Sequence, residues 1–398
     1  MHVFQMDNIS TLLIAVLVLM VGKYVRTKVG VLRKFFITVP VIGGVIFAIL
    51  TLIGHYSQTF EFSFDGTLKS LFMIAFFTTI GFMASLKMLA KGGVQVVIFL
   101  VVATALVILQ NIVGVSLAKV FGLNPLFGLA AGSVPLTGGH GTSGAFGPLL
   151  EQAGAAGATA VAIASATYGL VAGCLIGGPI GKRLMTKHNL KPSEEMLKEE
   201  HADVTNEDQK VEVTEHSFFS AVTVIVISMG LGSVLVGWLK QAGITLPIYI
   251  GPMLVAAVIR NVSDSMKKEL QHKEITIIGN TSLSLFLAMA LMSMRLWDLA
   301  ALAVPLITIL LVQTVLMAAF AYFVTFNVMG RDYDAAVMAC GHCGFGMGAT
   351  PNAIANMESF TSANYPSFKA FFVIPLVGAL FIDFTNASII TFFMNMFG

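Results

Sequence analysis

The chain has 398 residues, of which 56% are hydrophobic and only 11% are charged. Soluble domains carry about 25% charged residues, so this composition excludes an ordinary soluble protein and indicates a polytopic membrane protein. The net charge of +2 gives no sign of a nucleic-acid partner, and apolar runs that are continuous rather than alternating exclude a transmembrane β-barrel.

The first apolar run, residues 9–25, predicts a membrane-spanning helix. Its positive charges, Lys23, Arg26 and Lys28, follow the apolar core instead of preceding it, so we do not expect a cleavable signal peptide. A crossing needs roughly 20 apolar residues, and several later runs are long enough to span the lipid as helices. These runs include 71–86, 94–120 and 371–393.

One segment, residues 182–217, breaks the apolar pattern with many Lys, Arg, Asp and Glu. We interpret it as a cytoplasmic linker between two transmembrane repeats, 1–181 and 218–398. Short matches occur in the same order in both halves, which predicts an internal repeat. They are VPVIGG (39–44) with LPIYIG (246–251), TLKSLF (67–72) with TSLSLF (281–286), and GGHGT (138–142) with GMGAT (346–350).

The basic residues predict the orientation of the spans. We assign five spans to each half, with a glycine-rich hairpin between the fourth and fifth that enters the membrane and returns to the same side. The N-terminus then lies outside and the linker inside, and of the 23 Lys and Arg only Lys69, Lys119, Lys240 and Arg295 lie outside. If both glycine-rich segments crossed fully, the linker would lie outside.

An odd number of spans per half inverts the second half relative to the first. The predicted fold is therefore an all-α polytopic membrane protein of two inverted five-helix repeats, each with a re-entrant glycine-rich hairpin. The hairpins are expected near 132–150 and 339–357, and both termini lie outside. Inverted repeats with broken segments at matching positions are typical of secondary transporters.

The first glycine-rich segment reads PLTGGHGTSGAF (135–146), a poor helix former. Irregular backbone at membrane depth is tolerated only where protein or a water-filled cavity covers it. Its amides and the adjoining helix N-termini can hold an anion, and its carbonyls can hold a cation. The alternative is that the glycines only permit close helix packing. The polar candidates are Ser133, Thr137, Thr142 and Ser143 in the first hairpin, and Thr350 and Asn352 in the second.

Asp383 lies inside an apolar run, VGALFIDFTNASII. A carboxylate at the centre of a spanning helix costs about 2.5–3.5 kcal/mol on insertion scales, and such residues usually mark an ion or substrate path. Asn386 follows three residues later on the same helix face. We interpret Asp383 and Asn386 as oxygen ligands for Na⁺; the alternative is a structural aspartate.

Other polar residues have less specific roles. His140 and His342 either contact substrate or brace the hairpin backbone, and Gln110 and Asn111 either line the path or join helices. Cys340 and Cys343 have the spacing of a redox or metal motif but lack further ligands. With Cys174 also in an apolar segment, we expect no disulfide framework, and we expect no enzyme.

Four longer motifs resemble the bacterial sodium/glutamate symporter family. They are LTGGHGTSGAF, GNTSLSLFLAMALMSMRLWDLA, GHCGFGMGATPNAIANM and IPLVGALFIDFTNA, and the likeness runs nearly end to end. The family is similar in having two inverted five-helix domains, each with a GGxG motif in its re-entrant loop. That motif falls on Gly138, Gly139, His140 and Gly141. The second loop departs from it, with Cys343-Gly344-Phe345-Gly346 and no doubled glycine.

The resemblance implies Na⁺-coupled uptake of L-glutamate across a bacterial inner membrane, with Na⁺ as coupling ion. We expect alternating access, elevator-like, in which the hairpins and the last helix of each half move against a scaffold, with a homodimer by analogy. Arg260 and Arg295, at helix ends, are candidates for the second carboxylate of the substrate. Another anionic substrate, or an ion channel with two pore loops, remains an alternative. The expected substrate-binding residues are Ser133, Thr137, Gly138, Gly139, His140, Gly141, Thr142, Gly344, Gly346, Gly348, Thr350, Asn352 and Asp383.

Overall fold

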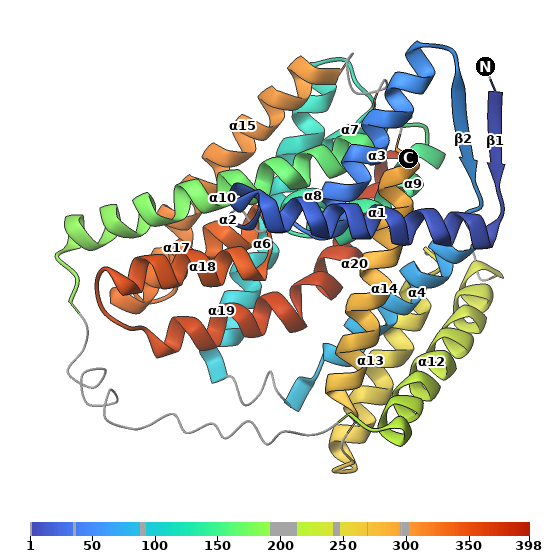
Figure 1. Ribbon diagram of the computed structural model, residues 1–398. Helices are drawn as coiled ribbons and strands as arrows, with labels where there is room; N and C mark the ends of the chain where they lie inside the picture. The colour runs from blue at the N-terminus through green and yellow to red at the C-terminus, as the bar shows by residue number, and fades with distance from the viewer. Residues whose placement is uncertain are drawn as a thin grey trace.

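Helices dominate the computed structural model, which describes residues 2–34, 37–87, 93–191, 213–241, 247–268, 270–294, 296 and 302–398 (Figure 1). Within these ranges seven helices are long and apolar enough to cross a membrane. They are α1 (Asn8–Lys28), α3 (Val39–Tyr56), α6 (Gly93–Val120), α10 (Ala158–His188), α12 (Glu215–Gln241), α14 (His272–Met292) and α15 with its continuation (Ala303–Val328). The chain is therefore a largely helical, multi-spanning protein, as its composition predicts.

The remaining expected spans are shorter or bent. Helices α4 (Thr67–Met83) and α13 (Ile250–Ser265) have 17 and 16 residues, about 25 Å of helix against a hydrocarbon core of about 30 Å. The last span, expected as one helix over 371–393, is instead α19 (Phe368–Leu380) followed by α20 (Ile382–Phe397), with a bend of 44° between them.

A small parallel sheet was not part of the all-α prediction. Strand β1 (His2–Met6) pairs with β2 (Phe60–Phe64), with His2 opposite Phe60 and Met6 opposite Phe64. The alternating aromatics of FEFSF are a period-two pattern. Phe62 stacks on Phe4 with ring centroids 5.6 Å apart, so the pairing also buries aromatic surface.

Three helices of each half pack together into what we call the six-helix group: α1, α3, α4, α12, α13 and α14. Small residues allow the close approaches. A Cβ at Gly22 of α1 would lie 2.2 Å from the carbonyl oxygen of Val39, where α3 begins. A Cβ at Gly232 of α12 would lie 2.1 Å from the nitrogen of Pro252 in α13. Helix pairs α1–α3 and α12–α13 therefore depend on glycine in the same way.

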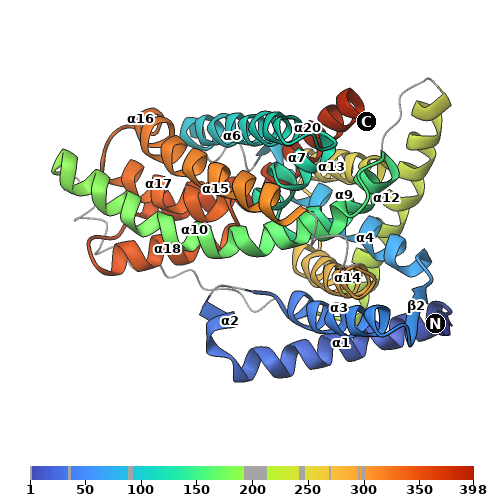
Figure 2. The ribbon, with the colours of Figure 1, turned by 90° about the horizontal axis from the view of Figure 1, so that it is seen from above.

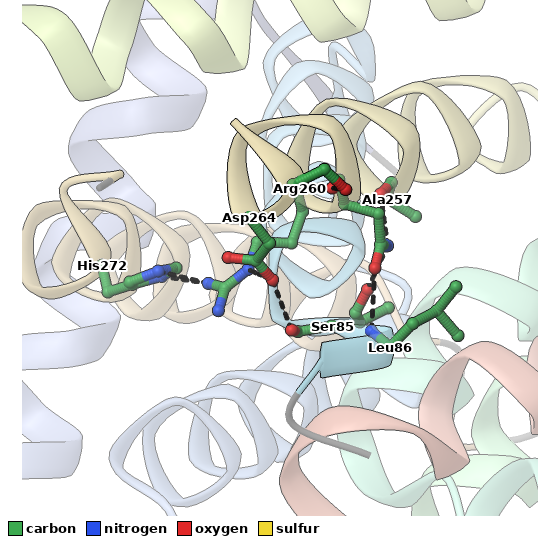
Figure 3. Close-up of polar contacts among 9 residues, drawn as sticks. Ser85, Leu86, Ala257, Arg260, Asp264 and His272 are labelled. Atoms are coloured by element: carbon green, nitrogen blue, oxygen red, sulfur yellow. Dashed lines mark hydrogen bonds and ion pairs between the residues drawn. The ribbon is translucent and has the colours of Figure 1, made fainter. Parts of the chain in front are cut away.

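A polar network joins the ends of three helices of this group (Figure 3). Ser85, after α4, donates to a carboxylate oxygen of Asp264 at 2.5 Å, and Arg260 pairs with the same oxygen at 3.0 Å. The Arg260 guanidinium also contacts the ring of His272 at the start of α14. Asn261 accepts from the amide of Leu86 at 2.8 Å. The network fixes α4, α13 and α14 to one another.

Most of the other helices form what we call the hairpin group, which contains both glycine-rich segments. Figure 2 shows α1 and α3 as a layer along the bottom of the view, with α14 between them and the hairpin group. Besides α6, α10, α15, α19 and α20, the group comprises α7 (Leu126–Ala130), α8 (Ser133–Leu136), α9 (Gly139–Gln152), the π-helical turn η2 (Ala321–Thr325), α16 (Phe326–Val328), α17 (Tyr333–Gly346) and α18 (Thr350–Ser362). One short helix outside both groups, α2 (Gly30–Lys34), follows α1.

Candidate functional site

Each glycine-rich segment is a pair of helices separated by a short break. In the first, α8 ends at Leu136 and α9 begins at Gly139, so Thr137 and Gly138 form the break. In the second, α17 ends at Gly346 and α18 begins at Thr350. The expectation of a long irregular stretch over 135–146 is therefore wrong, because the residues from Gly139 onward are helical. Most of them are buried, where tertiary packing overrides their low helix propensity.

The two breaks lie against each other. A Cβ at Gly139, whose φ is +63°, would be 3.3 Å from the carbonyl oxygen of Gly348. Helix α10 approaches the second break even more closely, since a Cβ at Gly169 would be 2.1 Å from the carbonyl oxygen of Met347. Only glycine combines a positive φ with this backbone contact at no steric cost. The glycines of both segments therefore serve to bring backbone to one place.

A cavity of about 430 Å³ opens at this place, between the two helix groups. The hairpin group contributes both breaks, together with Leu170 of α10 and Asp383 of α20. The six-helix group contributes the opposite wall, namely Arg26, Thr38, Phe76, Leu283 and Leu287. Of the residues predicted to bind substrate, nine line the cavity: Thr137, Gly138, Gly139, His140, Gly141, Gly348, Thr350, Asn352 and Asp383.

The electrostatics of the cavity favour a ligand that carries negative charge. Helices α9 and α18, of 14 and 13 residues, both begin at the breaks, so the positive ends of both dipoles face the cavity. Asp383 supplies a negative charge from the first turn of α20. The break ahead of α20 places this carboxylate at a helix start, where the dipole stabilises it, rather than at the helix centre expected from the sequence.

Amide side chains from neighbouring helices brace the breaks. Gln110 of α6 donates to the carbonyl oxygen of Gly346 at 2.7 Å and accepts from Thr137 at 2.8 Å, so one side chain joins both hairpins. Gln313 of α15 donates to the backbone of Gln110 at 2.7 Å. Asn111 accepts from the amide of Ser133 at 3.0 Å. Two roles were left open for Gln110 and Asn111, lining the path or joining helices. These hydrogen bonds join helices.

Asn386 lies beside the first hairpin but does not line the cavity. Its amide nitrogen donates to the carbonyl oxygen of Ser133 at 3.1 Å. Its own oxygen and the hydroxyl of Ser133 are buried and find no hydrogen-bond partner among the described residues. A buried polar atom without a partner needs an explanation, and a bound ion is one.

The other predicted residues support the breaks from behind. The side chain of Thr142 is buried against Gly138, Gly344 lies against the backbone of Asn352, and Gly346 is held by Gln110. The hydroxyl of Ser143 donates to the carbonyl oxygen of Gly139 at 2.7 Å. These residues shape the site, and none of them, nor Ser133, lines the cavity.

The two histidines differ in position. His140 lines the cavity and its Nε2 lies 3.0 Å from the hydroxyl of Thr167. His342 is fully buried in the core, with Nδ1 2.8 Å from Thr325 in the π-helical turn and its ring stacked on Phe345. Cys340 and Cys343 are buried free thiols. Only His140 is therefore placed to meet a ligand.

The positive side chain at the cavity is one that the sequence did not single out. Arg260, a candidate for the second carboxylate, is bound to Asp264 and His272 at the far end of α13 and does not line the cavity (Figure 3). Arg295 lies outside the described residues. Arg26 of α1 lines the cavity instead, and its Nε is buried with no partner in the described ranges. Arg26 was visible in the sequence as one of the basic residues after the first apolar run, but such residues are also explained by the orientation of the span in the membrane.

Comparison with known proteins gives a consistent result. The model of a family described as Sodium/glutamate symporter matches residues 4–366. The chain is 42% identical over 397 residues to the sodium/glutamate symporter of Escherichia coli (strain K12), covering 99% of this chain and 98% of that protein. It is 40% identical over 391 residues to the sodium/glutamate symporter of Haemophilus influenzae, covering 97% of both.

Proposed function

The chain belongs to the sodium/glutamate symporter family, and from this premise we propose that it carries L-glutamate into a bacterial cell together with Na⁺. The observation that carries the proposal is the cavity between the two helix groups. It brings together two helix N-termini and one carboxylate, the groups needed for the carboxylate and the ammonium of an amino acid.

The α-carboxylate of the substrate would bind to amides and hydroxyls at the breaks, between Thr137 and Gly141 on one side and at Thr350 on the other. Asp383 would face the ammonium group. Glycine at Gly139 and Gly348 leaves the backbone accessible because no Cβ intervenes. Substrate binding therefore uses mainly backbone groups of the hairpins, and this is compatible with the small number of charged residues at the cavity.

Sodium would be held next to the substrate mainly by neutral oxygens, and Asp383 would serve either this ion or the ammonium group, because the two roles compete for one carboxylate. The amide oxygen of Asn386 and the hydroxyl of Ser133 are buried and unpartnered within the described residues, and oxygen donors of this kind suit Na⁺ in transporters with broken helices. In the part of the chain that the structure describes, no cluster of three or more His, Cys, Asp or Glu side chains is present. Hydroxyl, amide and carbonyl oxygens would therefore supply most of the ligands.

Transport would proceed by alternating access, with the hairpin group moving against the six-helix group. Helices α6 and α15 pack with the hairpins, so the moving unit would be larger than the hairpins and last helices alone. A second cavity, of about 410 Å³, is lined by Lys69 and Glu151 among others. In the predicted orientation Lys69 is outside and Arg26 inside, so the two cavities would face opposite sides of the membrane.

The remaining features of the predicted architecture belong to the same proposal. Both termini would lie outside and the segment 182–217 in the cytoplasm, with the protein in the inner membrane. The inverted repeat is supported by the matching glycine contacts of α1–α3 and α12–α13. The apolar side chains exposed on α1 and α12 would contact lipid, and a homodimer is expected by analogy with other moving-domain carriers.

The proposal is tested by uptake of radiolabelled L-glutamate into proteoliposomes under an inward Na⁺ gradient, with K⁺ replacing Na⁺ as the control. We expect accumulation that saturates with glutamate and requires Na⁺. Asp383→Asn should reduce the initial rate by about tenfold or more, because a charge in a membrane path is rarely dispensable. Asp65→Asn, which removes a carboxylate that does not line the cavity, should leave uptake unchanged.

The same measurement distinguishes the channel alternative. A channel with two pore loops would pass ions without an organic substrate and would not accumulate glutamate against its gradient. Na⁺ flux independent of glutamate, with no accumulation under any gradient, would overturn the proposal. Accumulation that survives in Asp383→Asn would keep the carrier and remove Asp383 from the coupling path.

A further inference from the structure

Arg26 is the only Lys or Arg side chain among the described residues that line the cavity. The residue lies near the end of α1, in the six-helix group, yet its side chain lines the cavity that the two hairpin breaks form from the opposite side. Its Nε is buried and donates to no carbonyl or carboxylate among the described residues. An arginine held in this way has an unused donor at a ligand site.

Without Arg26, the cavity would lack a positive partner for the second carboxylate of glutamate. Glutamate carries one ammonium and two carboxylates. Asp383 matches the ammonium, and the N-termini of α9 and α18 match one carboxylate. Arg26 and Asp383 line the same cavity, but no ion pair joins them among the described residues. The arginine is therefore available to a ligand anion and is not neutralised by the aspartate.

Resting on the proposed function, we propose that Arg26 binds the side-chain carboxylate of the substrate and thereby selects acidic amino acids over their neutral amides. The planar guanidinium can donate two parallel hydrogen bonds to a carboxylate, which an ammonium cannot do with the same geometry. Because the arginine is on the six-helix group and the hairpins are on the other group, a bound dicarboxylate connects both walls of the cavity.

This assignment also explains why the helix breaks alone do not determine selectivity. Backbone amides and hydroxyls at Thr137–Gly141 recognise a carboxylate that every amino acid possesses. Selection for a second carboxylate needs a donor on the opposite wall, where the other lining residues are Thr38 and the apolar Phe76, Leu283 and Leu287. Arg26 is the one charged side chain on that wall among the described lining residues.

The test measures equilibrium binding of radiolabelled L-glutamate to Arg26→Gln and to wild type, both purified in detergent so that the cytoplasmic cavity is accessible, at saturating Na⁺. The half-saturating concentration of L-glutamate should rise by about tenfold or more, since hydrogen bonds to charged groups contribute about 1.5–3 kcal/mol. The number of glutamate sites per chain and the half-saturating Na⁺ concentration should change little. Competition by L-glutamine against labelled L-glutamate should become relatively stronger. Arg26→Lys, which keeps the charge but loses the fork, should show an intermediate shift.

Lys23→Gln is the matched control, because Lys23 is exposed on the same helix and does not line the cavity. It removes the same charge from the same membrane surface and should leave the glutamate affinity unchanged. If Arg26→Gln does not fold, as judged by gel filtration, the intermediate shift expected for Arg26→Lys still tests the assignment. A glutamate affinity in either folded variant equal to that of Lys23→Gln overturns it, as does an equal loss of affinity for Na⁺.

Failure of the assignment is distinct from failure of the proposed function. If wild type does not accumulate L-glutamate, the proposed function itself is wrong. If wild type accumulates it with Na⁺ and Arg26→Gln behaves as wild type, the carrier stands and the second carboxylate is held elsewhere.

Discussion

In the buried side chain of Asn386, the nitrogen has a hydrogen-bond partner and the oxygen has none among the described residues. Its nitrogen donates to Ser133, whereas its oxygen and the Ser133 hydroxyl have no partner among the described residues. Leaving buried acceptors empty costs about 1–3 kcal/mol each. A Na⁺ ion at this point would remove the cost, so we expect the pair to contribute to the affinity for Na⁺ more than to that for glutamate.

Asn386→Ala should therefore raise the half-saturating Na⁺ concentration by about fivefold, equivalent to one net hydrogen bond of about 1 kcal/mol. The glutamate affinity at saturating Na⁺ should be retained. The measurement is initial uptake as a function of Na⁺ concentration. Ser388→Ala, which changes an exposed position on the same helix, is the control. An unchanged Na⁺ curve would exclude Asn386 from the ion site.

Most of the break residues named from the sequence line the cavity, whereas Arg260, named as a candidate partner of the second carboxylate, does not. Glycines with hydroxyls in an apolar context have few other uses, so Thr137–Gly141 and Gly348–Asn352 could be identified from type and spacing. A long side chain at a helix end can turn either way. Arg260 turns to Asp264, and Arg26 turns to the cavity. That choice depends on partners distant in the chain, which a sequence alone does not place.

In helix α10, two glycines that look alike in the sequence have very different surroundings. Gly169 faces the second break at backbone contact distance, whereas a Cβ added at Gly178 of the same helix would meet nothing within 4 Å. Both are glycines within one apolar helix, so composition and propensity treat them alike. Their surroundings differ completely, and the two therefore form a matched pair.

Gly169→Ala should destabilise the protein by about 1–3 kcal/mol or more, because a Cβ would overlap the carbonyl of Met347 and push α17 and α18 away. Gly178→Ala should change the stability by less than about 1 kcal/mol, because its Cβ meets no atom beyond its chain neighbours and the gain in helix propensity is offset by the restriction that Pro179 places on the preceding residue. Thermal unfolding in detergent measures both. Equal stabilities for the two variants would contradict the close contact of α10 with the second break.

At the scale of elements, the long helices were predictable because apolar runs of 18 or more residues have few alternatives. The strands β1 and β2 were missed because their pairing joins segments separated by α1 and α3. The break between α19 and α20 was missed for a different reason. The run was interpreted as one span because it is apolar on both sides of Asp383, although Pro375 and Gly378 are residues that favour a bend.

The molecule as a whole divides along a surface that cuts across the sequence. Each half gives three helices to the six-helix group and the rest to the hairpin group. The predicted repeats divide the chain by sequence, at residues 182–217. The two groups instead divide it by which helices pack together, so each group contains helices from both halves. Relative movement of the groups would open and close the cavity, and this is the property that a crosslink can test.

Cysteines at Gly144 of α9 and Leu287 of α14, in a background with the three native cysteines replaced, would connect the groups. A Cβ at Gly144 would lie 3.3 Å from Leu287 Cδ2, so a short bifunctional thiol reagent should span the pair. Crosslinking should abolish uptake, and cleavage of a reducible reagent should restore it. A control pair at Gln5 and Ser63, two exposed residues opposite each other in the β1–β2 sheet next to α1 and α3, should crosslink without effect. Full uptake by the crosslinked Gly144–Leu287 pair would contradict movement between the groups.

The interleaved chain path also constrains biogenesis. The polypeptide moves from the six-helix group to the hairpin group after α4, returns before α12 and leaves again after α14. When the ribosome has released only α1 to α10, both groups lack essential members, and α4 has neither α13 nor α14 to cover it. We therefore expect the nascent first half to enter the bilayer with helix faces whose packing partners have not yet been synthesised. Maturation is consequently a late, post-insertion event in which the second half completes two bundles at once.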